Sequence, residues 1–395
     1  MNEWKKVRFL DVVHLNPRIS LEKGVEYPFV EMSNVVPCAR KPEKDVFKKY
    51  LGEGTKFEQG DTIVARIEPC LQNGKGFQCS YKQGFGSTEF LVFRPVNIND
   101  LDCDFLYYYM GQQSIREAMA KTMVGASGRQ RVNNKVFNDL QINLPPLSTQ
   151  HCIANILSRY DSLIENYQKQ IKLLEEAAQR LYKEWFVDLR FPGHENTNII
   201  DGVPEGWEKK RLNNLVNLQS GYAFKSSTFE ESGQYKIVTI KNVKDGLFDG
   251  DNVSFIKSIP EKMPAHCLLQ TGDILLSLTG NVGRVCFIIG KNYLLNQRVA
   301  KLDSHYPAFT YCLFRNHDMF IEVNNLANGA AQQNVSPIRI GEMKILLPNK
   351  EVLYKFESIT SKPIVGIISL QSQLRLLTEA RDRLLPKLMS GEITV

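Results

Sequence analysis

The chain has 395 residues, and its 49 lysines and arginines exceed its 43 aspartates and glutamates, which gives a net charge of +6. Its composition, 43% apolar and 23% charged, is typical of a folded protein and excludes bulk disorder. No apolar run approaches the roughly eighteen residues that a membrane span needs, and no apolar segment follows residues 1–6 as it would in a secretory signal. The mild basic excess permits a nucleic-acid partner without requiring one, because positive charge must be clustered to bind phosphates.

The eight cysteines are spread through the sequence, and no two lie within four positions of each other. This spacing excludes the Cys-x-x-Cys motifs of zinc and redox sites. A chain of this length does not need disulfides for a stable core, so we expect free thiols in a cytoplasmic protein.

An internal repeat at an offset of 203 residues organises the chain. Leu144-Pro145 recurs as Leu347-Pro348, and nine of the eighteen residues from 164 to 181 are identical to those 203 positions later. The middle of each copy aligns only with a slipped register, so we expect the ends to be the common part and the middles to have diverged. Each copy begins with a globular half in which residues 61–65 or 273–277 are predicted strands. A Leu-Pro turn and a long helix follow.

The repeat predicts an α/β protein with a pseudo-two-fold arrangement, in which two globular domains are separated by two long helices. The stretch between the copies is polar and punctuated by proline and glycine, which is typical of a linker. The predicted segments are a first globular domain at 1–147, a helix at 148–190, a linker at 191–203, a second globular domain at 204–348 and a second helix at 349–395.

Both predicted helices carry apolar residues at alternating steps of three and four, the spacing of a coiled-coil seam. About 33 residues at about 1.5 Å each correspond to a rod of about 50 Å. Pro363 and Pro386 interrupt the second helix, so we expect it to be shorter or kinked. The simplest arrangement is that the two seams pack against each other, and the alternative is that each helix packs only on its own domain. The predicted seam residues are Leu157, Ile164, Ile171, Leu174, Leu181, Ile367, Leu370, Leu374, Leu377 and Leu384.

The sequence carries no catalytic signature of its own. Residues 143–147 are only superficially similar to the Asn-Pro-Pro-aromatic site of an adenine methyltransferase, and a turn before a helix explains them better. The Gly-x-x-x-x-Gly-Lys-Ser/Thr loop of a nucleotide-driven motor is absent. Glu342 and Lys344 match a common fragment of nuclease sites, and the six histidines have no metal-ligand spacing. We therefore expect no metal site and no catalysis by this chain alone.

Two loops in each globular half are candidates for DNA contact. Residues 121–138 carry four basic and no acidic residues, and the corresponding loop of the second copy is rich in amides. Arginine pairs with guanine edges, and asparagine or glutamine pairs with adenine edges. A second loop follows the predicted strand of each half; the alternative for all of them is a solvated surface loop. The candidate residues are Arg66, Lys75, Ser127, Arg129, Gln130, Arg131 and Lys135 in the first half, and Thr279, Asn281, Arg284, Gln332, Gln333 and Asn334 in the second.

Three motifs along the chain match a known family in combination. They are LPPL at 144–147 followed by Gln150, PEGW at 204–207, and RDRLLPKLMSGEI at 381–393. With these motifs the chain resembles, over its entire length, the DNA specificity subunit of type I restriction–modification enzymes. The second copy departs from the pattern at 347–350, where LPNK lacks the second proline and the following leucine.

The resemblance implies that each globular half is a target recognition domain and that the two helices form an antiparallel coiled coil. It implies binding to double-stranded DNA at a bipartite site, with two methyltransferase subunits and motor/nuclease (restriction) subunits as partners. S-adenosylmethionine, ATP and magnesium are then expected on those partners, and no cofactor on this chain. Trp185 and Phe186, at the end of the first helix, are expected to meet the methyltransferase subunits. The alternative functions are a non-catalytic assembly scaffold that binds proteins through its globular halves and, less favoured, a nuclease.

Overall fold

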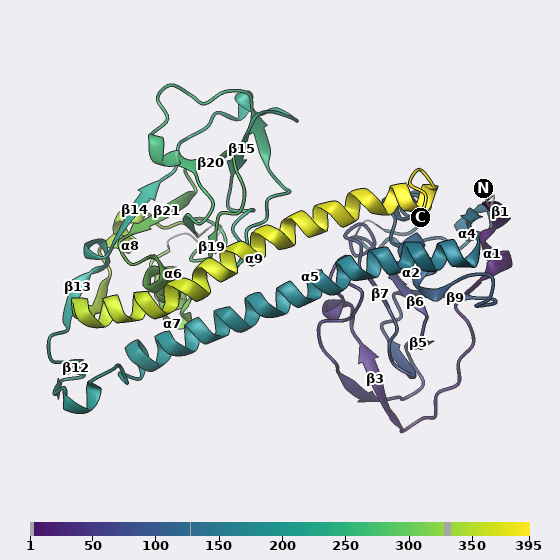
Figure 1. The fold of residues 1–395 in the computed structure, drawn as a ribbon, viewed down its shortest axis with the longest axis horizontal. Helices are drawn as coiled ribbons and strands as arrows, with labels where there is room; N and C mark the ends of the chain where they lie inside the picture. The colour runs from purple at the N-terminus through teal and green to yellow at the C-terminus, as the bar shows by residue number, and fades with distance from the viewer. Residues whose placement is uncertain (1–3, 127, 328–332) are drawn as a thin grey trace. The chain divides into compact units, whose positions relative to one another are not determined.

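The computed structural model describes residues 4–126, 128–327 and 333–395 (Figure 1). The chain divides into two compact units, one formed by Met1–Glu165 with Leu376–Val395 and the other by Asn166–Arg375. Each unit therefore combines one globular domain with about half of each long helix. The predicted α/β class is confirmed, because each unit combines mixed β-sheets with helices.

The globular part of the first unit is built on two four-stranded sheets. Its elements are β1 (Lys5–Arg8), α1 (Phe9–Val12), β2 (Val13–Leu15), β3 (Glu26–Val30), η1 (Met32–Asn34), β4 (Phe47–Lys49), β5 (Thr55–Glu58), β6 (Thr62–Ala65), β7 (Gly76–Gln78), β8 (Gln83–Gly86), β9 (Phe90–Pro95), α2 (Cys103–Met110), α3 (Gln113–Ala120), α4 (Val136–Asp139) and β10 (Gln141–Leu144). One sheet has the antiparallel order β2-β9-β6-β7, and the other has the order β4-β3-β8-β5 with β3 and β8 parallel. Strand β1 pairs separately with β10.

The globular part of the second unit repeats this topology strand for strand. Its sheets have the orders β14-β21-β18-β19 and β16-β15-β20-β17, with β15 and β20 parallel, and β13 pairs with β22. The elements are η3 (His194–Asn196), β11 (Ile199–Ile200), β12 (Val203–Pro204), β13 (Glu208–Arg211), η4 (Leu212–Asn214), β14 (Val216–Ser220), η5 (Ser226–Thr228), β15 (Tyr235–Val238), β16 (Ser254–Ile256), η6 (Ala265–Cys267), β17 (Leu268–Leu269), β18 (Ile274–Ser277), β19 (Val285–Phe287), β20 (Tyr293–Leu295), β21 (Val299–Ser304), α6 (Pro307–Arg315), α7 (His317–Asn325), α8 (Pro337–Gly341) and β22 (Lys344–Leu347).

The two predicted central strands are present as β6 and β18, and every residue of both is buried. In the first unit Phe57, Phe77 and Phe90 pack edge to face beside β6, with ring centroids 5.5 and 5.8 Å apart along the series. Such apolar runs are stable in a sheet that is covered on both faces. The middles of the two copies have therefore diverged in sequence while keeping the burial pattern that defines one topology.

The two long helices are α5 (Leu147–Tyr182), which continues into a short π-helix, η2 (Lys183–Val187), and α9 (Lys350–Ser390). Figure 1 draws each as a continuous helix. The expectation of a shorter or kinked second helix is wrong as to its length, because α9 has 41 residues and α5 has 36, and the kink stays a prediction. A proline inside a helix removes one backbone hydrogen bond. Near Pro363 the side chains of Thr360 and Ile364 are buried, and this packing holds the helix together across the proline.

The contacts within each unit show that α5 and α9 run antiparallel. In the first unit the early residue Leu157 of α5 shares a core with the late residue Leu388 of α9. In the second unit the late residue Ala178 of α5 shares a core with the early residue Phe356 of α9. All ten predicted seam residues are buried or half-buried. The buried stripe of α9 also contains the polar residues Thr360, Gln371 and Arg381, which the apolar spacing did not indicate.

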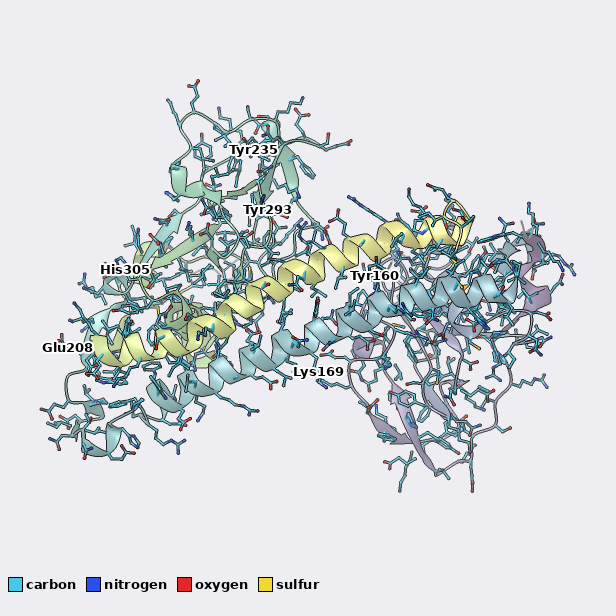
Figure 2. The ribbon with its side chains drawn as sticks, in the orientation of Figure 1. Tyr160, Lys169, Glu208, Tyr235, Tyr293 and His305 are labelled. Atoms are coloured by element: carbon cyan, nitrogen blue, oxygen red, sulfur yellow. The ribbon has the colours of Figure 1, made fainter. Side chains whose placement is uncertain are left out.

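Trp185 and Phe186 lie in the core of the second unit and not at a free helix end. Trp185 is buried, and the ring of Phe186 packs against those of Phe309 and Phe356 with centroids 4.8 and 4.9 Å apart. The expectation that Trp185 meets a partner is therefore wrong, because its own domain covers it, whereas Phe186 is half-buried and the expectation for it stays a prediction. Lys169, in contrast, is exposed on α5 (Figure 2).

None of the described helices is both long and apolar enough to cross a membrane. All eight cysteines are among the described residues, and each is present as a thiol.

Candidate nucleic-acid interface

In the first unit, the two candidate loops lie side by side at the end of β6. The backbone N–H of Glu68 donates to the carbonyl of Gln130 at 3.1 Å, and the N–H of Val132 donates to the carbonyl of Arg66 at 2.9 Å. Arg131 lies opposite Ile67 in an isolated β-bridge. Residues 130–132 therefore form a short strand-like segment that extends the sheet beyond β6.

The second unit contains the same arrangement at the end of β18. The N–H of Gly280 donates to the carbonyl of Gln333 at 2.9 Å, and the N–H of Val335 donates to the carbonyl of Leu278 at 3.0 Å. Asn334 lies opposite Thr279 in the equivalent bridge. The Thr279 hydroxyl also donates to the Asn334 side-chain oxygen at 2.8 Å, which leaves the NH₂ group of that amide available for other contacts. We call these two paired segments, residues 66–68 with 130–132 and residues 278–280 with 333–335, the extended edges.

The extended edge of the first unit is held by an ion pair. The Arg131 guanidinium donates from Nε and Nη2 to both carboxylate oxygens of Glu89, at 2.5 to 3.0 Å. Hydrogen bonding to Arg131 lowers the pKa of Glu89. The backbone carbonyl of Glu89 in turn accepts from the N–H of Arg66 at 2.9 Å. The Nε of Arg66 is buried and has no hydrogen-bond partner among the described residues.

Sequence reasoning missed Glu89 and its counterpart in the second unit, Arg298. The carbonyl of Arg298 accepts from the N–H of Leu278 at 3.0 Å, as that of Glu89 does from Arg66. Each residue directly precedes a buried strand, β9 or β21. That position is the only signal in the sequence, and it becomes informative only after the two copies are aligned through their structure.

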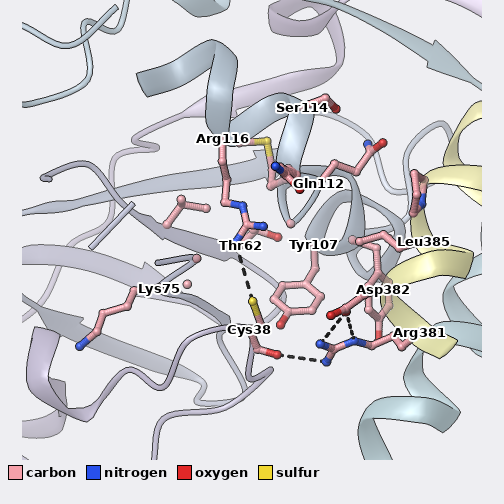
Figure 3. Close-up of a pocket in the computed structure, with 18 of the residues that line it drawn as sticks. Cys38, Thr62, Lys75, Tyr107, Gln112, Ser114, Arg116, Arg381, Asp382 and Leu385 are labelled. Atoms are coloured by element: carbon pink, nitrogen blue, oxygen red, sulfur yellow. Dashed lines mark hydrogen bonds and ion pairs between the residues drawn. The ribbon is translucent and has the colours of Figure 1, made fainter. Parts of the chain in front are cut away.

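The remaining candidates have different surroundings. The Lys75 ammonium donates to the Met32 carbonyl at 2.8 Å, so it is committed within the domain. Lys75 also contributes to a cavity of about 330 Å³ in the first unit, in which its ammonium points away from Arg381 and Asp382 (Figure 3). Arg129, Lys135 and Asn281 are exposed, whereas Arg284 and Gln130 are half-buried and Thr279 is buried. Ser127 and Gln332 lie outside the described residues.

Within residues 4–126, 128–327 and 333–395, no group of three His, Cys, Asp or Glu side chains is arranged to hold a metal ion. Glu342 and Lys344, the nuclease-like fragment, are exposed beside and on strand β22. What the extended edges offer chemically is therefore hydrogen bonding: guanidinium and amide donors on short segments that the backbone holds in place.

Comparison with known proteins gives matches over both halves of the repeat. A family model described as the type I restriction modification DNA specificity domain matches residues 1–176 and again residues 204–365. The specificity subunit of the type I restriction enzyme MjaIX from Methanocaldococcus jannaschii is 29% identical over 306 residues, which cover 74% of this chain and 69% of that protein. The specificity subunit of HindI from Haemophilus influenzae is 23% identical over 465 aligned positions that cover both chains completely.

Among solved structures, the fold is similar to that of the S subunit of a type I restriction–modification system from M. genitalium. The TM-score is 0.56 at 18% sequence identity, and the alignment covers 98% of this chain and 96% of the other. At this identity the similarity concerns the fold.

Proposed function

The chain belongs to the family of type I restriction–modification DNA specificity domains, and we propose that it is the specificity subunit of such a system, recognising a bipartite duplex sequence with one half-site for each globular domain. The observation that carries this proposal is the pair of extended edges. Each has the same backbone hydrogen bonds and the same place at the end of a buried strand.

The side chains on the two edges differ. The first edge carries Gln130 and Arg131, and the second carries Gln333 and Asn334. Backbone contacts to DNA fix the position of a protein on the duplex, and side chains that reach the base edges determine the sequence. One scaffold with two sets of side chains supports recognition of two different half-sites.

The chemistry on DNA belongs, in this proposal, to partner subunits. Two methyltransferase subunits would bind S-adenosylmethionine, and motor/nuclease subunits would bind ATP and magnesium, while this chain catalyses nothing. The pseudo-two-fold pair of helices supports two equivalent partners, because each half of the repeat presents an α5-like helix beside its domain. An assembly scaffold without DNA recognition is not favoured, because both halves match a DNA specificity domain.

The proposal is tested on the full chain assembled with its modification subunits. Sequencing of methylated host DNA identifies the recognition site, and fluorescence anisotropy then compares duplexes with and without it. We expect the site to be preferred over random sequence, with affinity falling steeply as salt rises. Binding that is equal for all duplexes would contradict the proposal.

Asn334→Ala provides the residue-level test, because the Asn334 amide is exposed on the second edge. A bidentate contact to adenine contributes about 1–3 kcal/mol of discrimination, so we expect about a 5- to 140-fold loss of preference at one base pair. Asn217→Ala is the matched control, since Asn217 is exposed on β14, away from that edge. Equal behaviour of the two variants would exclude Asn334 from base recognition.

A further inference from the structure

The residue before β9 and the residue before β21 occupy equivalent positions in the two units. Strand β6 pairs with β9 so that Ala65 lies opposite Phe90, and β18 pairs with β21 so that Ser277 lies opposite Val299. One step further along, the N–H of Arg66 donates to Glu89, and the N–H of Leu278 donates to Arg298. Each residue therefore belongs to the strand next to the segment that carries the extended edge.

The chemistry at this position is reversed between the two units. In the first unit an acidic residue, Glu89, accompanies an arginine, Arg131, on the edge. In the second unit an arginine, Arg298, accompanies an amide, Asn334, and Arg298 is exposed. The part of the chain that the structure describes offers Arg298 no ion-pair partner within 4.0 Å. A carboxylate in one domain and a guanidinium in the other, at the same backbone position, would give the two domains different preferences for the bases they contact.

The ion pair in the first unit leaves one side of the Arg131 guanidinium available. Glu89 accepts from the Nε and Nη2 side, and Nη1 makes only a long contact of 3.4 Å to the carbonyl of Arg129. Arginine has five N–H donors, so the donors at the outer ends of Nη1 and Nη2 still point away from the carboxylate. Those two donors match the O6 and N7 acceptors of guanine. Holding the guanidinium in one orientation also reduces the entropy that is lost when it binds.

We propose that the residue before β9 or β21 determines specificity in each domain: Glu89 is a positioning residue that orients Arg131 toward a guanine of the first half-site, and Arg298 itself contacts a guanine of the second. This inference rests on the proposed function. It adds two residues to the recognition surface and assigns each a different role.

The experiment measures a complete specificity profile. The full chain, assembled with its modification subunits, is titrated against a fluorescent duplex that carries the site found by methylation sequencing. It is then titrated against every single base-pair substitution of both half-sites. The variants are Glu89→Gln, Arg131→Gln, the double variant of these two, and Arg298→Gln. Thermal melting of each variant confirms that the chain is folded.

We expect Glu89→Gln to lower discrimination about tenfold at one base pair of one half-site, the same base pair that Arg131→Gln affects. The double variant should lose no more than Arg131→Gln alone, because Glu89 acts through Arg131. Arg298→Gln should lower discrimination by a similar factor at one base pair of the other half-site. A merely structural role would change all affinities together and leave the profile unaltered.

Glu117→Gln is the control for charge. It removes the same negative charge from an exposed residue of α3 in the same unit, where Glu117 accepts from Gln113. It should raise affinity for all duplexes slightly and leave the profile of the unmodified protein intact. If Glu89→Gln gives the same profile as Glu117→Gln, or if Arg298→Gln leaves both half-sites unchanged, the inference is overturned while the proposed function stands. If the unmodified complex itself prefers no sequence, the proposed function fails.

Discussion

Asp161 of α5 and Arg381 of α9 form an ion pair inside the first unit. Their side chains are 6% and 10% exposed, and Arg381 Nη1 donates to Asp161 Oδ1 at 2.9 Å. The Tyr108 hydroxyl donates to the other carboxylate oxygen at 2.6 Å, and Arg381 also donates to the carbonyl of Cys38 at 3.2 Å. A buried charge is tolerated when its hydrogen-bonding capacity is filled, as it is here. The pair therefore fixes which residues of the two helices face each other.

Removing one partner of this pair should destabilise the protein. We expect Asp161→Asn to lower the free energy of unfolding by about 3 kcal/mol, because the buried Arg381 would lose its buried counter-charge and keep only the carbonyl of Cys38 and the exposed Asp382 as partners. The double replacement Asp161→Leu with Arg381→Met should recover most of this loss, since apolar groups of similar volume need no hydrogen bonds. Urea denaturation measures both values. A single variant as stable as the unmodified protein would mean that the pair is not needed for stability.

At the scale of single elements, α9 shows how packing overrides a local preference. The backbone nitrogen of Pro363 has no hydrogen to donate, and its ring crowds the preceding turn. Relative to alanine, proline in a helix interior costs about 3 kcal/mol. The helix nevertheless continues, because Phe356, Ile364 and Ile367 belong to the core of the second unit.

Replacing this proline should therefore stabilise the protein. We expect Pro363→Ala to raise the free energy of unfolding by about 1–2 kcal/mol, the helix gain less the extra freedom of the unfolded chain. The urea midpoint should rise with the slope unchanged. Ser369→Ala, an exposed substitution further along α9, is the control and should change stability by less than about 0.5 kcal/mol. A loss of stability on Pro363→Ala would mean that the core depends on the local geometry that the proline imposes.

Some of these elements could be predicted from the sequence, and others could not. The helices follow from a regular three–four spacing, and β6 and β18 follow from short apolar runs next to turns. The length of α9 does not follow from the sequence in this way, because the cost of Pro363 is local whereas its compensation comes from packing against core residues of the same unit that are far away in the sequence. The pairing of residues 130–132 with 66–68 is likewise a contact between segments about sixty positions apart. Glu89 and Arg298 gain their meaning only from that pairing.

At the scale of the whole molecule, the repeat explains why one chain contains two versions of one site. The backbone hydrogen bonds of the extended edges are the same in both units, so they tolerate changes of side chain. The central strands are buried in both units, whereas the edges carry exposed side chains that differ between the units. The chain can therefore keep one architecture while each half acquires its own target.

Within each unit, α5 and α9 face each other in a similar register. Asp161 pairs with Arg381 in the first unit, and in the second a Cβ at Gly366 would lie 3.4 Å from Leu174. A residue of α5 and a residue of α9 therefore face each other when the sum of their residue numbers is about the same as for Asp161 and Arg381. The boundaries after Glu165 in α5 and after Arg375 in α9 match by this rule. These are the positions at which both helices can be lengthened together.

One heptad inserted at each boundary, with the apolar spacing kept, would lengthen both helices by about 10.5 Å without shifting the seam. If the helices set the distance between the half-sites, the preferred spacer should grow by about three base pairs at about 3.4 Å each, and both half-sites should stay the same. Three base pairs also rotate one half-site by about 100°, so binding to the new spacer should be weaker than the original binding. Binding to duplexes with a series of spacer lengths measures the preferred spacer.

Seven Gly/Ser residues inserted in the exposed turn at Asp201-Gly202 are the control, and this insertion should leave the preferred spacer length unchanged. A heptad variant that still prefers the original spacer with unchanged affinity would show that the helices do not set the distance.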